Sequence, residues 1–153
     1  MIELDRFDRS ILSLLQGNAR MANTELAERV GLSPSACLRR VQRLEKTGII
    51  AGYVALLDPQ AVGRNSTAFV EVTLQSQGEE ALAAFEQAAS ACPDVLECHL
   101  VAGDFDYLLR VAVAGTQEYE RLHKGELSRL PHVMRLKTVF VLRTAVKRTD
   151  YPL

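Results

Sequence analysis

The sequence predicts an α+β chain of two domains. Apolar residues recur at helical spacing in the first third of the chain, whereas helix-like and strand-like patterns alternate beyond residue 66. A stretch rich in Pro, Gly, Asn and Ser (DPQAVGRNS, 58–66) separates the two patterns. We therefore expect a helical domain over residues 1–57, a linker over 58–66 and an α+β domain over 67–153.

Two short amphipathic helices are expected first. The first helix ends near Gly17, and Asn23 is expected to cap the second, which Gly31 closes. The expected inward positions are Leu4, Phe7, Ile11, Leu14 and Leu15 in the first helix, and Leu26, Ala27 and Val30 in the second.

A third helix is predicted between Gly31 and Gly48, with Ser33 as N-cap and Pro34 at its first position. Its expected apolar stripe holds Cys37, Leu38, Val41 and Leu44, and its opposite face gathers Ser35, Arg39, Arg43 and Lys46. Residues 39–46 carry four basic side chains and one acidic one, which suits a helix in a DNA major groove. A charge run this short is, by itself, more often a solvated helix face.

Three short helices with a Gly-containing turn between the last two form the helix-turn-helix arrangement, in which the last helix reads DNA. The strand-like run 49–57 indicates a winged variant. Within the last helix, the backbone at Ser33 is expected to meet a phosphate and the first two turns are expected to meet base edges. The expected base contacts are Ser35 and Arg39, and the expected phosphate contacts are Arg40, Arg43 and Lys46.

The second half predicts a ferredoxin-like βαββαβ sandwich, with both helices on one face of an antiparallel sheet. The expected strands are 67–74, 95–102, 107–113 and 133–146, and the expected helices are 78–92 and 116–130. The segments ACPDVLEC and LPHVMRLK repeat one pattern at the end of each helix. Val139 and Val141 alternate with Phe140 and Leu142, so we expect the open sheet face to be buried against another subunit.

Composition and motifs exclude several classes. The net charge is −1, no apolar run approaches the roughly 20 residues of a membrane span, and a cytoplasmic protein is expected. The three cysteines form no C-x-x-C pair, so neither a disulfide framework nor a metal site is indicated. No nucleophile elbow, P-loop or dinucleotide fingerprint is present, and Asp104 and Asp106 do not form a settled acid/base pair. We expect no catalytic residues and no cofactor.

The sequence resembles the Lrp/AsnC family, the leucine-responsive and feast/famine transcription regulators of prokaryotes. The matching segments cover nearly the whole chain: LDRFDRSILSLLQGNAR, ELAERVGLSPSACLRRVQRLEKTGIIAGYVALLDP, VAGDFDYLLRV and ELSRLPHV. The resemblance implies a regulator that binds double-stranded DNA as a homodimer, assembled further into tetramers, octamers or larger rings. Many members have Ser at the position of Ala22, so the start of the second helix departs from the family pattern.

The resemblance also implies an amino-acid effector bound at the junction between dimers, near the loop after the second strand. The loop is apolar around its polar ends, which mildly favours an aliphatic amino acid such as leucine. The residues carried over are Leu100, Val101, Gly103, Asp104, Phe105 and Asp106, with Leu136 and Thr138 facing the loop from the last strand. Gly103 can adopt positive φ, and Asp104 or Asp106 can accept an ammonium group. From the residues alone, a plain hairpin turn explains this loop equally well.

A further alternative is a sensing or assembly module whose helix-turn-helix binds protein rather than DNA. The salt dependence of DNA binding separates the two, because a DNA reader loses affinity steeply as counterions compete for the phosphates.

Overall fold

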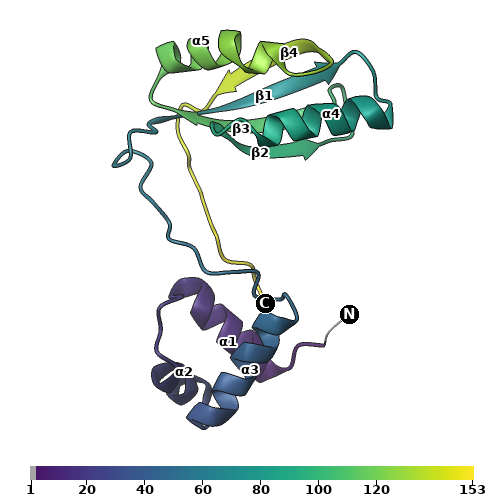
Figure 1. Ribbon diagram of the computed structural model, residues 1–153. Coiled ribbons are helices and arrows are strands. Elements are labelled where there is room, and N and C mark those ends of the chain that lie inside the picture. Colours follow the sequence, from purple (N-terminus) through teal and green to yellow (C-terminus); the bar gives the residue numbers. More distant parts are fainter. Residues whose placement is uncertain (1–2) are drawn as a thin grey trace. The chain divides into compact units, whose positions relative to one another are not determined.

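The computed structural model describes residues 3–153, and the chain forms two compact units (Figure 1). The helical unit runs to Leu56 and also includes the tail Ala145–Leu153. The sheet unit comprises Leu57–Thr144. The tail therefore groups with the helical unit, whereas the sequence division assigned it to the second domain.

The helical unit contains α1 (Arg6–Gly17), α2 (Asn23–Val30) and α3 (Pro34–Lys46). Its buried core residues are Ile11, Leu12, Leu26, Ala27, Cys37 and Leu44. The prediction that Leu38 belongs to this core is wrong, because its side chain is 45% exposed. Leu38 lies about 100° around the helix from Cys37, which places it at the border of the outward face.

The start of α2 also differs from the prediction. Asn23 is the first helical residue and not the N-cap, and the N-cap Ala22 offers no side-chain oxygen. The Asn23 side-chain amide instead donates to the carbonyl of Pro34 at 2.8 Å. Because Pro34 begins α3, this bond joins the start of α2 to the start of α3.

The expected strand over residues 49–57 is not formed within the described part of the chain. A strand needs a neighbour to receive its backbone hydrogen bonds, and no described segment pairs with this one. Ile49 and Ile50 pack against the helical core, but the apolar side chains further along remain open to solvent, with Val54 80% and Leu56 71% exposed.

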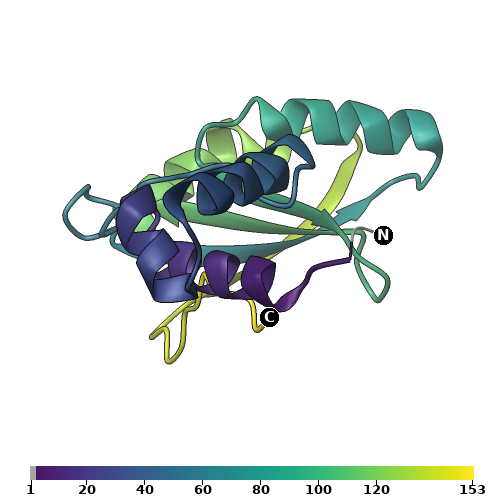
Figure 2. The same cartoon turned by 90° about the horizontal axis from the view of Figure 1, so that it is seen from below.

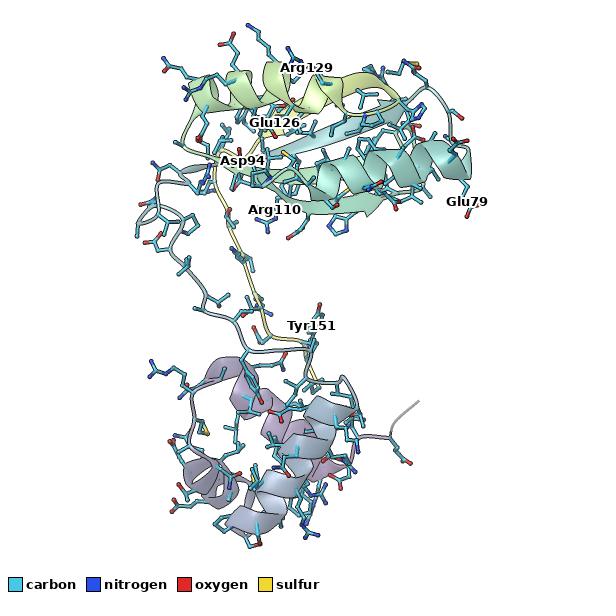
Figure 3. The ribbon with its side chains drawn as sticks, viewed as in Figure 1. Glu79, Asp94, Arg110, Glu126, Arg129 and Tyr151 are labelled. Atoms are coloured by element: carbon cyan, nitrogen blue, oxygen red, sulfur yellow. The ribbon has the colours of Figure 1, made fainter. Side chains whose placement is uncertain are left out.

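The tail Ala145–Leu153 completes the helical unit. The Gln16 side chain on α1 accepts a hydrogen bond from the Tyr151 backbone N–H at 2.6 Å and donates to its carbonyl at 3.1 Å. An open apolar cavity of about 380 Å³ lies between α1, residues 49–56 and the tail, with Leu153 in its lining. Figure 3 labels Tyr151 at this position.

The sheet unit confirms the predicted βαββαβ order. Its elements are β1 (Ser66–Leu74), α4 (Glu79–Ser90), β2 (Val95–Leu100), β3 (Tyr107–Val113), α5 (Thr116–Gly125) with a 3₁₀ turn (Leu127–Arg129), and β4 (Val133–Phe140). The sheet is antiparallel with strand order β2-β3-β1-β4. Both helices cover one face of the sheet (Figures 1 and 2).

Four elements of this unit end earlier than predicted: α4 at Ser90 and β2 at Leu100 by two residues each, and α5 and β4 by more. β4 stops at Phe140 instead of continuing to residue 146, because its neighbour β1 begins at Ser66 and the last pairing bond runs from Val141 N–H to the Thr67 carbonyl at 2.9 Å. Helix α5 stops at Gly125 instead of residue 130, and the 3₁₀ turn replaces its expected end.

One sheet face packs on the helices and the other is open. Val70, Val72 and Leu109 are fully buried beneath α4 and α5. The opposite face combines half-buried Phe69 with Val139, its partner across the strands, which is 47% exposed. Two ion pairs lie on the same open face: Glu97 with Arg110 at 2.6 Å and Glu71 with Lys137 at 3.1 Å.

Candidate DNA-reading face and ligand cleft

The start of α3 has the geometry that its sequence predicts. Gly31 ends α2 in the left-handed conformation, with φ of 72°, which glycine adopts without a steric cost. Ser33 is the N-cap of α3, and its Oγ accepts a hydrogen bond from Ala36 N–H at 3.3 Å. Short turns therefore present the start of α3 to solvent, as a helix that enters a groove requires.

The outward face of α3 carries three of the six predicted DNA contacts. Ser35, Arg39 and Lys46 are all exposed and lie within about 40° of one another around the helix axis. Sequence reasoning missed exposed Gln42, which lies on the same face and whose amide can pair with adenine. The signal was present, since Gln42 lies about 20° from Ser35 and about 40° from Lys46 on a helical projection.

Arg40 and Arg43 point toward α1 instead. The Arg40 guanidinium donates to Asp5 at 2.7 Å and to Asp8 at 2.9 Å, and Arg43 donates to Asp8 at 2.5 Å. The Arg40 guanidinium also lies 5.3 Å from the centre of the Phe7 ring. An open depression of about 370 Å³ lies here, lined by Asp5, Leu32, Ala36, Arg39, Arg40 and Arg43.

Asp5 and Asp8 form a capping box at the start of α1. Asp5 Oδ1 accepts from the N–H groups of Phe7 and Asp8, while Asp8 Oδ2 accepts from Asp5 N–H at 3.2 Å. The backbone N–H of Asp8, followed by Arg40, lowers the pKa of Asp5 to about 2. Both interactions favour the charged carboxylate.

The predicted effector loop borders an open cleft of about 560 Å³ in the sheet unit. Its lining includes the predicted residues Leu100, Val101, Gly103, Phe105 and Asp106, together with Gln77, Leu82 and Ala102. Sequence reasoning missed Gln77 and Leu82, because the fold brings them to the loop from the end of β1 and from α4. Gly103 does not use the positive φ that the sequence left open to it.

The two loop aspartates differ in their surroundings. Asp106 is 7% exposed, and its oxygens accept from Leu74 N–H and from the Gln77 amide, each at 2.7 Å. Asp104 is exposed and is not part of the cleft lining. Asp106 therefore ties the loop to the end of β1 and also presents a carboxylate beside the cleft.

Within one chain, Leu136 and Thr138 do not face this loop, so their predicted role requires a second copy of the chain. β4 lies at the opposite edge of the sheet from β2, and both side chains turn toward the helices. Leu136 packs on the core, and the Thr138 hydroxyl is hydrogen-bonded to the Tyr119 hydroxyl.

The described residues contain no cluster of His, Cys, Asp and Glu with metal-binding geometry. The cysteines are free, and burial raises the pKa of the Cys92 thiol to about 11. No helix among the described residues is both long and apolar enough to cross a membrane.

Two protein-family models match the chain, one in its N-terminal part and one in its C-terminal part. Residues 4–51 match a family described as winged helix-turn-helix DNA-binding, and residues 67–151 match the Lrp/AsnC ligand binding domain. The leucine-responsive regulatory proteins of Klebsiella pneumoniae and Escherichia coli K12 are each 44% identical to this chain over 148 residues, which is 97% of this chain and 90% of theirs.

Solved structures agree with this placement. A transcriptional regulator from Neisseria meningitidis, crystallised with L-Met, has a TM-score of 0.93 and 36% identity, covering 98% of this chain and 97% of its own. An AsnC family regulator from Agrobacterium tumefaciens has a TM-score of 0.92 and 36% identity, covering 97% of each chain. The chain belongs to the Lrp/AsnC family of transcriptional regulators, with an N-terminal winged helix-turn-helix DNA-binding domain and a C-terminal ligand-binding domain.

Proposed function

We propose that this regulator reads DNA through the outward face of α3, with Ser35 and Arg39 at base edges and Lys46 at phosphates. The observation that carries the proposal is that Ser35, Arg39 and Lys46 are exposed on one face of a helix whose start is also exposed. An arginine in the first turns of such a helix reaches guanine with two parallel hydrogen bonds. A lysine further along neutralises phosphate without reading sequence. DNA lies in the cytoplasm of a bacterium, so we expect the chain to act there, and the proposal includes no catalytic step.

Binding titrations at two salt concentrations test these roles. The duplexes are one that the wild-type protein selects from a randomised library and one of random sequence. Arg39→Ala is expected to weaken binding to the selected duplex by roughly 1–3 kcal/mol and binding to random DNA much less. Lys46→Ala is expected to weaken both about equally and to reduce the salt slope by about one. Equal losses for the two variants on both duplexes would reject this assignment.

We propose further that the cleft beside residues 101–106 takes a free amino acid. Leu82 and Leu100 offer an apolar wall, and exposed Asp104, which stands in the sequence between the lining residues Gly103 and Phe105, can accept an ammonium group. The Neisseria meningitidis relative was crystallised with L-Met, and a thioether side chain suits such a wall.

Calorimetry with a panel of amino acids, led by methionine and leucine, tests this cleft. Binding is expected to weaken in Asp104→Asn and to stay unchanged in Asp150→Asn, since residue 150 lies in the tail. A panel that gives neither heat nor thermal stabilisation would reject the effector site and leave the DNA assignment standing.

The open sheet face is proposed as the homodimer interface. Phe69 and Val139 give it an apolar centre, and the flanking ion pairs of Glu71 and Arg110 restrict how a second copy fits. Arg110, labelled in Figure 3, points to this face, away from the helices. Further assembly to tetramers or octamers is an expectation from the family resemblance.

Sedimentation tests the dimer. Val139→Asp is expected to dissociate it, whereas Leu142→Asp is not, because Leu142 follows the end of β4 and is already 99% exposed. A Val139→Asp protein that sediments as the wild type does would exclude this face.

A further inference from the structure

We propose that Asp8 is a positioning residue for DNA reading: its carboxylate fixes the rotation of α3 and withholds Arg40 and Arg43 from phosphates. The proposal rests on the DNA-reading role of α3 stated above. It assigns a functional role to a side chain on α1, outside the helix that reads DNA.

The Asp8 side chain joins α1 to α3 through two ion pairs. Its side chain is 1% exposed, and its two oxygens receive Arg40 at 2.9 Å and Arg43 at 2.5 Å. Asp5 N–H donates to it at 3.2 Å, so the capping box of α1 holds the carboxylate in place. Asp5 binds Arg40 as well, at 2.7 Å, and encloses the same guanidinium from the exposed side.

The ion pairs of Arg40 and Arg43 with Asp8 fix the rotation of α3 about its own axis. Arg40 and Arg43 are three residues apart and therefore lie on neighbouring turns of one side of α3. Arg39 precedes Arg40 by one residue, or about 100° around the axis, so holding Arg40 toward α1 turns Arg39 outward. A rotation of α3 by about 100° would bring Arg39 into the place of Arg40 and turn Ser35 away from the reading face.

The same contacts remove charge from the DNA-binding face. Two aspartates and two arginines form a neutral group, which leaves Arg39 and Lys46 as the free cations of α3 among the described residues. Moving Arg40 and Arg43 to phosphates would strand a buried carboxylate without a partner, which is strongly unfavourable. Specific reading thus depends on keeping non-specific phosphate contacts few.

Asp8→Asn tests the proposal, with Glu28→Gln as the matched control. Glu28 is exposed on α2, and its neutralisation changes the charge equally without contacting Arg40 or Arg43. Asp8→Asn is expected to bind a random duplex as tightly as the wild type or more tightly, with a salt slope steeper by about 0.9 for each arginine released. Its preference for the selected duplex is expected to fall about tenfold or more. Glu28→Gln is expected to keep the wild-type preference.

A purely structural role predicts otherwise: Asp8→Asn would lose affinity for both duplexes in proportion to its unfolded fraction, and this result would overturn the proposal. An unchanged preference would overturn it as well.

Arg40→Gln provides a second test if Asp8→Asn fails to fold, with Arg29→Gln as its control. Arg29 is another paired arginine of the helical unit, bound to Glu25 at 2.7 Å. If Arg40 is withheld from phosphates, both variants share one salt slope on random DNA. A slope shallower by about 0.9 in Arg40→Gln alone would show that Arg40 binds phosphate and would reject the proposal. A wild-type protein that enriches no sequence would contradict the proposed function instead, and the random-duplex comparison would still decide the role of Arg40.

Discussion

The two buried carboxylates of the described residues, Asp8 and Asp106, are held by different kinds of partner. Asp8 is 1% exposed and binds guanidiniums at the ends of long side chains, one of which, Arg43, is 48% exposed. Asp106 is 7% exposed and binds the backbone N–H of Leu74 and the amide of Gln77. Removing Asp8 leaves partners that can reach water, namely two guanidiniums and the N–H of exposed Asp5, whereas removing Asp106 leaves the buried N–H of Leu74.

The largest effect is therefore expected for Asp106→Ala. It removes two hydrogen bonds to a charged acceptor and leaves the Leu74 N–H buried without a partner, at a cost of about 3 kcal/mol. Native-state hydrogen exchange of β1 and β3 amides measures this loss within the sheet unit. Asp104→Ala is the control, because its exposed side chain should contribute little. Equal exchange in the two variants would contradict the structural role of Asp106.

A smaller loss is expected for Asp8→Ala, about 2 kcal/mol, measured by hydrogen exchange of the α1 and α3 amides. The cost is lower because Arg40 keeps Asp5 as a partner and Arg43 gains water. The loss should shrink modestly near 1 M salt, because Arg43 is about half exposed and its attraction to Asp8 is partly screened, while the loss in Asp106→Ala changes less. A loss at Asp8 that grew with salt would contradict this electrostatic contribution.

The contribution of Asp5 to the stability of the helical unit should be lost in acid. Its pKa falls from the ordinary 3.8 to about 2 in the folded state, so its contribution is complete above the ordinary value and is lost as pH falls through about 2. Asp5→Asn should remove this part of the acid dependence of the helical unit, followed by α1 amide exchange or helicity between pH 4 and 2. Unchanged acid dependence in Asp5→Asn would contradict the lowered pKa.

The smallest effect is expected at the exposed pair of Glu25 and Arg29, 2.7 Å apart with both side chains about half exposed. Glu25→Gln should cost at most about 0.5 kcal/mol, because exposed ion pairs contribute little. Exchange of α2 amides measures it. A loss of stability as large as that of Asp8→Ala would show that burial does not explain the different contributions of Asp8 and Glu25.

Local patterns predicted most of the fold. The helical spacing around Ile11 and Leu44 and the strand alternation around Val70 depend on near neighbours, so they are readable without a structure. Leu38 was misplaced because it lies at the border of the outward face of α3. Asn23 was misplaced because its hydrogen-bond partner, Pro34, belongs to another helix. The strand at 49–57 failed for the same reason, since strand pairing is a property of two segments.

The candidate sites divide in the same way. The outward positions of Ser35, Arg39 and Lys46 follow from helical geometry alone. The partners of Arg40 lie 32 and 35 residues earlier in the chain, and no local pattern joins them. Gln77 likewise reaches Asp106 across 29 residues, so the cleft needed the topology of the sheet to be complete.

The bond between Gln16 and Tyr151 bears on how the chain matures during synthesis. The helices of the first unit leave the ribosome early, but the segment that covers the apolar cavity beside α1 follows the whole sheet unit. Domains generally fold as they emerge, so the three helices form first with that cavity open to solvent. The DNA-reading unit is therefore the first to begin folding and the last to be completed.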